Sequence, residues 1–400
     1  MILRVKKLGE IAQVQSGGTP SRSKSEYWSN GDIPWVKISD FNTKFIFKTD
    51  ECITKAGLDN SSAKILLPGT ILMTIFATIG EVAILNIHAS TNQAIAGIKI
   101  FNEEEVNREY LYYFLKYKSM DLINSGRGVA QKNINLSMLR DVNVPLPPVK
   151  EQKRIAEILD KAQKLIDLKE KSLNTLMNLE ESLFYQMFGD PRLNKNNWSL
   201  RTLKEVSEKF SDGPFGSNLK TEHYTTDGVR VIRLQNIGKG SFANENKSFI
   251  SEEHFEKLKK HKCEPNDVLI ATIGNPNLRA CLLPEFITEA INKADCIQCR
   301  PDQRMVLPEY ICSLLNTRAI LDSVSNLIHG QTRSRISMGQ LSKLEIVVPP
   351  IELQKKYRQA IKKIVIKQQK TKESLFELQN LFQSLLQRAF KGELTKQKVR

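Results

Sequence analysis

The sequence contains few cysteines, and their irregular spacing does not indicate a disulfide framework. Six cysteines among 400 residues suit a reducing compartment. The N-terminus has a short apolar start and no cleavage site, so no signal peptide is predicted. The most apolar stretch, Gly69–Leu85, includes Glu81 and is shorter than the roughly 18–20 apolar residues of a membrane span. The sequence therefore predicts a soluble cytoplasmic protein without a membrane partner.

Motifs for catalysis and cofactor binding are also missing. The segment IGKGS lacks the preceding glycine of a phosphate-binding GxxxxGK[ST] loop, and neither an amino-methyltransferase [DN]PP signature nor an acidic nuclease cluster is evident. Cys296 and Cys299 have the spacing of zinc ligands, with His261 and Cys263 as further candidates. The equivalent strand of the first half, AIAGIKI, has no cysteine. We therefore expect a binding protein with no catalytic residues, metal or cofactor of its own.

Positive charge is abundant but unevenly distributed. The chain has 59 Lys+Arg against 44 Asp+Glu, a net charge of +15, and a pI of about 9.4. A pI this high favours nucleic acid as a partner. Residues 1–148 have 17 basic and 14 acidic residues, and residues 189–350 have 22 and 19, so each segment carries only +3. Residues 351–390 have nine basic and three acidic residues, or +6, which suits a solvated basic helix or a docking face for DNA or an acidic partner.

The second half of the chain repeats the first. Residues 134–153, INLSMLRDVNVPLPPVKEQK, align with residues 336–355, ISMGQLSKLEIVVPPIELQK, at an offset of 202. Six positions are identical, where chance would give about one: Ile134/Ile336, Leu139/Leu341, Pro147/Pro349, Pro148/Pro350, Gln152/Gln354 and Lys153/Lys355. The two halves therefore share a fold.

Each half consists of a β-rich part followed by a long helical segment. Runs such as DIPWVKI and GTILMTI, separated by Gly, Asn, Pro and Asp, predict strands. Segments 149–188 and 351–390 follow a Pro-Pro pair and contain no Gly or Pro, which predicts two helices of about 60 Å. The fold class is α+β, with domains at 1–148 and 191–350 and spacer helices at 149–190 and 351–400, the last including a basic tail.

Apolar residues in both helices recur every 3.5 positions, which is typical of a coiled-coil seam. Lys169 and Glu180 interrupt the series in the first helix. Two surface helices packed on their own domains are the alternative, but matched helices of this length need an apolar partner. The predicted seam residues are Ile155, Leu159, Ile166, Leu176 and Leu183 in the first helix, and Ile361, Ile364, Leu375, Leu378 and Leu385 in the second.

Polar and basic residues gather around the predicted strands. Such side chains read base edges or hold phosphates, although each loop taken alone is better explained as solvated surface. The candidates are Thr19, Arg22, Lys24, Lys37, Arg127, Gln131, Lys132 and Asn133 in the first half, and Asn218, Lys220, Arg233, Gln235, Asn275, Asn277, Arg279, Gln331, Arg333 and Arg335 in the second. Gln131 and Asn133 are equivalent, at the offset of 202, to Arg333 and Arg335. The matching scaffold therefore carries loops with different side chains, as expected of two domains that recognise different DNA sequences.

The order of these motifs carries a resemblance to a known family. KKLGEIAQVQSGGTP and RTLKEVSEKFSDGPFG open the halves, and PLPPVKEQKRIAEILD and VVPPIELQKKYRQAI close them. The doubled series, over nearly the whole chain, resembles the specificity subunit of a type I restriction–modification system. The second half departs from the first where GDIPW becomes GVRVI and KRIAEIL becomes KKYRQAI.

The resemblance implies a pseudo-twofold DNA-binding subunit without catalysis. Two target-recognition domains, separated by antiparallel helices, would each read one half of a bipartite, asymmetric site in double-stranded DNA. Two modification subunits would bind the scaffold and carry S-adenosylmethionine and adenine methylation, with restriction subunits as optional further partners. The alternatives are a coiled-coil DNA-organising protein without sequence preference and a methyltransferase or nuclease fragment with an unrecognised site. Competition by unrelated DNA tests the first, and cofactor binding by the isolated chain tests the second.

Overall fold

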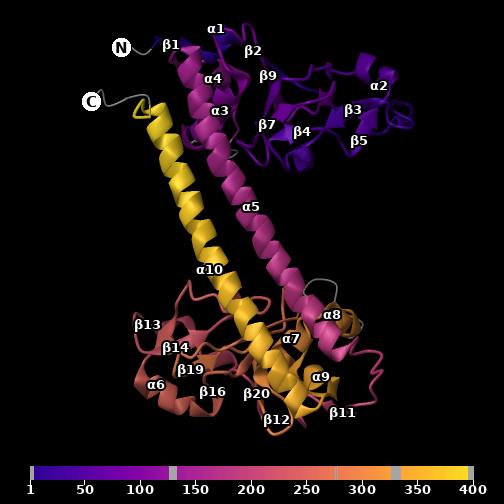
Figure 1. Cartoon of the computed structure of the whole chain (residues 1–400), viewed down its shortest axis with the longest axis vertical. Helices are drawn as coiled ribbons and strands as arrows, with labels where there is room; N and C mark the ends of the chain where they lie inside the picture. The colour runs from indigo at the N-terminus through magenta and orange to yellow at the C-terminus, as the bar shows by residue number, and fades with distance from the viewer. Residues whose placement is uncertain (1–3, 126–132, 275, 277, 326–334, 395–400) are drawn as a thin grey trace. The chain divides into compact units, whose positions relative to one another are not determined.

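A computed structural model describes residues 4–125, 133–274, 276, 278–325 and 335–394 (Figure 1). The chain divides into two compact units. Unit 1 comprises Met1–Glu170 and Ser374–Arg400, and unit 2 comprises Lys171–Glu373. Each unit contains one β-rich domain and parts of both long helices, so each is described by itself.

The β-rich part of unit 1 contains a five-stranded and a three-stranded sheet. The first has the order β2-β9-β6-β7-β4, and the second β5-β3-β8. Along β6, Ile71 and Met73 join one hydrophobic core while Leu72 joins another, because successive side chains of a strand point to opposite faces. The strands are β1 (Arg4–Lys7), β2 (Ala12–Ser16), β3 (Ile33–Val36), β4 (Phe45–Ile46), β5 (Glu51–Ile53), β6 (Ile71–Thr74), β7 (Val82–Leu85), β8 (Ser90–Thr91), β9 (Ile95–Ile100) and β10 (Asn143–Leu146), of which β1 pairs with β10.

Short helices connect these strands, and one longer helix covers the core. Tyr110, Tyr113 and Phe114 of α3 are buried and contribute the largest side chains to the main core of unit 1. The helices are α1 (Leu8–Ile11), α2 (Lys55–Asp59), α3 (Arg108–Ser125) and α4 (Leu136–Arg140), with 3₁₀ turns η1 (Ser25–Tyr27) and η2 (Ile38–Asp40).

Unit 2 repeats this plan. Its sheets have the orders β12-β20-β17-β18 and β13-β15-β14-β19-β16, and the parallel pair β14–β19 corresponds to β3–β8. The strands are β11 (Ser199–Thr202), β12 (Ser207–Asp212), β13 (Tyr224–Thr225), β14 (Val229–Ile232), β15 (Phe249–Ile250), β16 (Lys262–Cys263), β17 (Val268–Ala271), β18 (Arg279–Leu282), β19 (Ala290–Asn292), β20 (Cys296–Pro301) and β21 (Glu345–Val348). The helices are α6 (Glu252–Lys257), α7 (Pro308–Leu315), α8 (Arg318–Ser325) and α9 (Met338–Ser342), with 3₁₀ turns η3 (Gly216–Asn218), η4 (Thr221–His223), η5 (Leu234–Asn236) and η6 (Lys259–His261).

Two 40-residue helices follow the Pro-Pro pairs, as the sequence predicts. They are α5 (Val149–Phe188) and α10 (Ile351–Phe390). Gly189, directly after α5, has φ +74°, a left-handed conformation that commonly ends helices because glycine adopts it without strain. Among the described residues, no helix is apolar over enough of its length to cross a membrane.

The long helices pair antiparallel inside each unit. In unit 1, the start of α5 shares a core with the end of α10, including Phe382 and Leu386. In unit 2, the end of α5 shares a core with Tyr357 and Ile361 from the start of α10. Each helix thus begins on the domain that precedes it in the chain and ends in the core of the other unit.

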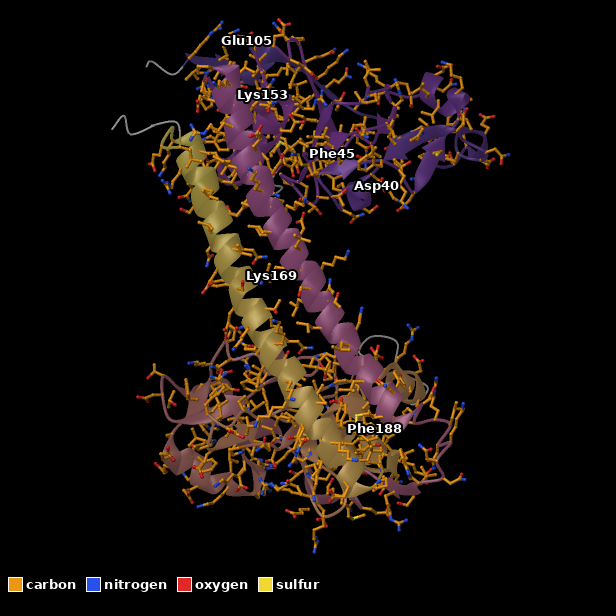
Figure 2. The ribbon with its side chains drawn as sticks, in the orientation of Figure 1. Asp40, Phe45, Glu105, Lys153, Lys169 and Phe188 are labelled. Carbon is orange, nitrogen blue, oxygen red and sulfur yellow. The ribbon has the colours of Figure 1, made fainter. Side chains whose placement is uncertain are left out.

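Equivalent phenylalanines complete the two helix ends. Phe390 lies 5.4 Å from the ring of Tyr110, and Phe188, labelled in Figure 2, lies 4.9 Å from the ring of Tyr310. The two phenylalanines are separated by 390 − 188 = 202 residues, the offset of the sequence repeat. Aromatic clusters of this kind bury large apolar areas and stabilise the docked helix ends.

A buried glutamine fixes the start of each long helix. The side-chain oxygen of Gln152 accepts a hydrogen bond from the Asn107 amide at 2.8 Å, and its nitrogen donates to the carbonyls of Glu105 at 3.0 Å and Pro147 at 2.8 Å. Gln354 makes the same three bonds in unit 2, to the backbone of Leu307, Met305 and Pro349. We call each of these arrangements a glutamine clamp.

Replacing Gln152 by leucine should lower stability, because it leaves a buried amide and two carbonyls without partners. We expect a loss of about 1–3 kcal/mol or more, measured as a lower midpoint in thermal or urea unfolding. Gln369→Leu is the control, because Gln369 is exposed on α10 and bonds only Glu373 within its own helix. Equal midpoints for the two variants would contradict the role given to the clamp.

Candidate nucleic-acid interface

The first candidate loop follows β2 and packs closely against its neighbours. A Cβ atom on Gly17 would lie 2.1 Å from the Thr91 side chain, and one on Gly18 would lie 2.3 Å from Ser62, so neither position admits a side chain. Trp35 of β3 is buried, and its indole nitrogen donates to the Gly18 carbonyl at 3.0 Å. The backbone that leads to the polar residues is therefore firmly held.

Arg22 lies on an aromatic and acidic support. Its guanidinium carbon is 3.6 Å from the ring centroid of Trp28, and the Trp28 ring meets that of Trp35 edge to face at 5.0 Å. Its Nη1 is 2.7 Å from a carboxylate oxygen of Glu51 in β5. The Arg22 side chain remains 55% exposed. A guanidinium held this way keeps free donors in a restricted orientation.

Glu51 also binds a second cation. The amine of Lys37 is 2.9 Å from Glu51 and 3.7 Å from Asp50. The Arg22 and Lys37 hydrogen bonds lower the pKa of the Glu51 carboxyl below its ordinary value. Arg22 and Lys37 thus share the Glu51 carboxylate, and Asp50 lies beside Lys37.

The neighbouring candidates lie on the same part of unit 1. The hydroxyl of Thr19 donates to the side-chain oxygen of Gln93, and the amine of Lys24 donates to the Tyr27 hydroxyl at 2.9 Å. Hydrogen bonding to Tyr27 raises the pKa of the Lys24 amine. The structure therefore gathers Thr19, Arg22 and Lys24 around one loop.

Unit 2 repeats the frame of this site but not its side chains. The backbone amide of Lys37 donates to Asp40, labelled in Figure 2, at 2.8 Å, and that of Arg233 donates to Asn236 at 3.0 Å. In this part of the chain the offset between equivalent residues is 233 − 37 = 196, and the turns η1 and η4 are also separated by 196 residues. At this offset Asn218 stands where unit 1 has Arg22.

The cation of unit 2 has a weaker partner than its counterpart. In unit 1, Trp35 is paired with Glu51 between β3 and β5. Val231 is the counterpart of Trp35 at the offset of 196, and its amide bonds the Ser248 carbonyl beside β15. Ser248 is therefore the counterpart of Glu51. Arg233 donates to the Ser248 hydroxyl at 3.3 Å. Beside it, Gln235 is exposed.

Asn218 and Lys220 lie beside a pair of histidine rings. The Asn218 carbonyl is 2.9 Å from Nε2 of His254, whose ring is 4.1 Å from that of His223. The Lys220 amine is 3.4 Å from Glu222. Both Asn218 and Lys220 are exposed.

Two of the candidate arginines hold backbone or acidic groups within unit 2. The Arg279 guanidinium donates to the carbonyls of Ile237 at 3.1 Å, Ile273 at 3.3 Å and Pro276 at 2.9 Å. Arg335 lies 3.4 Å from Asp295. These interactions occupy guanidinium donors of Arg279 and Arg335 that, from the sequence, we expected to bind DNA.

Several candidates lie outside the described residues. These are Arg127, Gln131, Lys132, Asn275, Asn277, Gln331 and Arg333. Asn133, at the edge of one such segment, is exposed.

The predicted seam residues divide between the two units. Three are buried in the main core of unit 1, where three more are partly buried: Ile155, Leu159 and Ile166, then Leu375, Leu378 and Leu385. In unit 2, Ile361 is buried, and Leu183 and Ile364 pack against the same core. Leu176 is half-buried, and its carbonyl accepts a bond from Gln368 at 3.3 Å.

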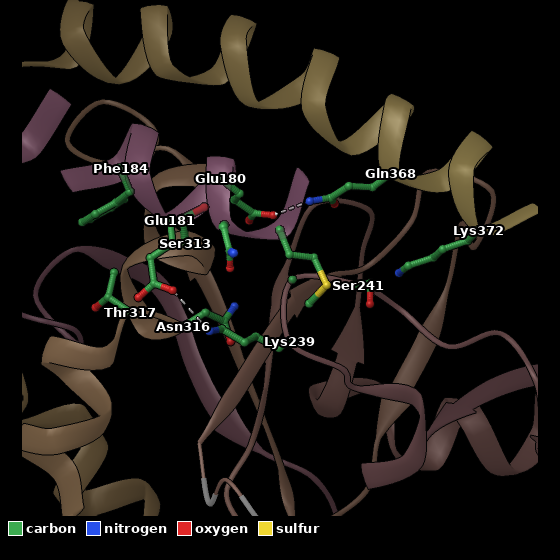
Figure 3. A pocket seen from close by; sticks show the side chains of 13 residues that line it. Glu180, Glu181, Phe184, Lys239, Ser241, Ser313, Asn316, Thr317, Gln368 and Lys372 are labelled. Carbon is green, nitrogen blue, oxygen red and sulfur yellow. Dashed lines mark hydrogen bonds and ion pairs between the residues drawn. The ribbon is translucent and has the colours of Figure 1, made fainter. Parts of the chain in front are cut away.

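A pocket of about 210 Å³ interrupts the helix pair in unit 2 (Figure 3). Glu180 of α5 accepts a hydrogen bond from Gln368 of α10 at 3.1 Å, and burial raises the pKa of the Glu180 carboxyl. At the offset of 202, unit 1 has Phe382 and Ile166 in these places, both buried in its apolar core. The two ends of the helix pair therefore differ in chemistry at equivalent positions.

The cysteines of unit 2 belong to its cores. Cys296 and Cys299, three residues apart on β20, join different hydrophobic clusters, as their opposite directions on a strand require. Burial raises the pKa of both thiols to about 12. No group of three or more His, Cys, Asp or Glu side chains suited to a metal occurs in the described part of the chain.

Sequence reasoning missed the residues that support Arg22. Trp28 and Glu51 belong to no motif, Trp35 lies in the predicted strand DIPWVKI, and strand pairing rather than sequence proximity brings Glu51 to the loop. Two tryptophans seven residues apart beside a basic loop were the available signal, because the chain contains only three.

The sequence matches the type I restriction modification DNA specificity domain over residues 3–178 and 195–380. The chain belongs to this family. The two matches correspond to the two halves of the duplication. As a type I specificity subunit, the chain determines the DNA site that its restriction–modification complex recognises, and it is a non-catalytic component that binds no cofactor itself.

Known proteins agree with this assignment. The type I restriction enzyme MjaIX specificity subunit of Methanocaldococcus jannaschii is 27% identical, over 98% of this chain and 93% of that subunit. The S subunit structure from M. genitalium has a TM-score of 0.55 at 16% identity, over 97% of this chain and 96% of that one. A structure described as the basis of complex assembly and conformational transition of the type I R-M system has a TM-score of 0.56 at 17% identity, over 98% of each chain. At these identities, the two structural matches show a shared fold.

Acid should release Arg22 from Glu51. Because the folded pKa of Glu51 is lowered, its ion pairs stabilise the loop above the ordinary pKa of a glutamic acid and are lost as pH falls through the lowered value. We expect a change in tryptophan emission in that acidic range, since Arg22 contacts Trp28. The Glu51→Gln variant should lack it, whereas Glu26→Gln, which removes an exposed acid 3.9 Å from Lys24, should keep it. The same transition in all three proteins would refute the assignment to Glu51.

Proposed function

We propose that this specificity subunit reads a bipartite, asymmetric site in double-stranded DNA. The recognition domain at 1–148 contacts one half-site, and the domain at 191–350 contacts the other. Asymmetry follows because the two domains present different side chains on one frame. A symmetric site would require similar readers in both domains.

The observation that carries the proposal is the contrast at equivalent positions. The paired turns at Lys37 and Arg233 share their backbone bonds. Around them, domain 1 has Arg22, stacked on Trp28 and bound to Glu51, where domain 2 has Asn218. An arginine held in this way suits bidentate bonding to guanine, whereas asparagine suits adenine.

The other candidates divide by what their donors already bind. Lys24, Lys37 and Lys220 suit phosphate contacts, and the exposed Gln235 and Asn133 suit base edges. Arg279 supports its loop, because its guanidinium already donates to three carbonyls. Arg127, Gln131, Lys132, Gln331 and Arg333 remain candidates on sequence grounds alone.

Two modification subunits are the proposed partners. Leu179 of α5 and Leu381 of α10 are 49% and 52% exposed, and 381 − 179 = 202, the offset of the repeat. Equivalent exposed leucines on two equivalent helices suit two copies of one partner. S-adenosylmethionine and methyl transfer belong to those subunits, restriction subunits are optional additions, and the complex acts on DNA in the cytoplasm.

Changing Arg22 or Arg233 to alanine should relax recognition in one half-site each, and the two half-sites should differ. A lost bidentate contact corresponds to about 1–3 kcal/mol of discrimination. Sequencing of methylated sites in cells that carry each variant with its modification subunit measures the preference. Lys257→Ala, which removes an exposed cation paired with Glu253, is the control and should leave the site unchanged. Relaxation of the same half-site by both variants would disprove the two-reader arrangement.

Aspartate at Leu179 or Leu381 should each remove one modification subunit from the complex. A charge placed at an apolar contact cannot be buried without a large desolvation penalty. Native mass spectrometry should show one modification subunit per chain for either variant and none for the double variant. Phe286→Asp, at a 68% exposed residue of domain 2, should retain both. Full assembly in the double variant would show that the leucines are not the docking sites.

A further inference from the structure

One stretch of α10 carries cations without acids. Residues 353–372 contain eight Lys and Arg and no Asp or Glu, a local charge of +8. The equivalent residues of α5, 151–170, contain five basic and five acidic residues and are neutral. The duplicated helices have therefore diverged in charge while they share length and bounds.

Three of the eight cations have acidic neighbours in unit 2. Lys355 is 2.7 Å from Glu352, Arg358 is 2.8 Å from Glu309, and Lys372 lines the pocket beside Glu180. The remaining five are exposed and form no ion pair with the described residues: Lys356, Lys362, Lys363, Lys367 and Lys370. Their charge is not neutralised within the described chain.

Four of these lysines lie on one face of α10. At 100° per residue, Lys356, Lys363, Lys367 and Lys370 fall within about 60° of one another, along about 21 Å of helix. The buried Tyr357 and Ile361 lie about 120° away around the helix. We call these four residues the lysine stripe.

We propose that the lysine stripe binds the phosphate backbone of DNA without reading sequence. The proposal rests on the proposed recognition of double-stranded DNA, but not on which loops read the bases. Lysine is a flexible point charge that suits phosphates, and it is depleted from protein–protein interfaces. Where the stripe has Lys367 and Lys370, α5 has the exposed Leu165 and Leu168, which suit an apolar protein partner instead.

The test replaces the stripe residues together, as Lys356→Gln, Lys363→Gln, Lys367→Gln and Lys370→Gln in the full chain. DNA affinity is measured against salt concentration, in complex with the modification subunits. Each phosphate contact contributes about 0.9 to the slope of log affinity against log salt. Four lost contacts should reduce the slope by about 3–4 for both cognate and unrelated DNA, and the methylated sequence should stay the same.

Two further variants separate charge from other effects. Four arginines at the same positions should restore the slope, because they restore the charge. The control replaces Lys153, Lys161, Lys164 and Lys171 of α5 by Gln, which removes equal charge from exposed positions of the other helix and should change the slope less. Folding of each variant is checked by its unfolding midpoint.

An unchanged slope in the stripe variant would overturn the proposal. If assembly with the modification subunits were lost at an unchanged slope, the stripe would belong to an acidic protein partner. An equal loss of slope in the α5 control would show that only the net charge matters, and would also overturn the proposal. A parent complex without sequence preference would instead contradict the proposed function, and this outcome is read from the parent alone.

Discussion

The glutamine clamp is the interaction on which the arrangement of each unit depends. One buried amide joins the segment before α3 or α7, the proline after the last strand, and the first turn of a 40-residue helix. A tyrosine hydroxyl adds a further bond in each unit, from Tyr110 to the Pro145 carbonyl and from Tyr310 to the Val347 carbonyl. Because the clamp occurs twice with the same three bonds, the direction in which each long helix leaves its domain is set in the same way. The loops that differ between the two units, such as those that contain Arg22 and Asn218, are carried by this repeated arrangement.

The two proposed recognition surfaces differ in how their cations are paired. In unit 1 Glu51 binds Arg22 and Lys37, Asp50 lies beside Lys37, and Arg22 contacts Trp28. In unit 2 the equivalent cation, Arg233, bonds the Ser248 hydroxyl, and α10 adds five lysines that form no ion pair with the described residues. Binding by the first surface should therefore depend more on geometry, and binding by the second more on ionic strength.

The sequence predicted the elements whose signals are local. The bounds of α5 and α10 followed from the Pro-Pro pairs and the absence of Gly and Pro. It did not predict what strand pairing brings together, such as Glu51 with Arg22, or the three carbonyls around Arg279. Leu176 fits the seam period but is only half-buried, and its neighbour Met177 lines the pocket that contains Glu180. The 3.5-residue spacing of apolar residues does not indicate how deeply each of them is buried.

The distribution of thiols has a practical consequence. Cys263, Cys281, Cys296, Cys299 and Cys312 are buried, and burial raises their pKa values, so they form little thiolate near neutral pH. Cys52 alone among the six is not buried. It is adjacent to Glu51 on β5. A maleimide dye would therefore attach first beside the Arg22 loop, and the native chain would provide a fluorescent reporter of that loop without engineered cysteines.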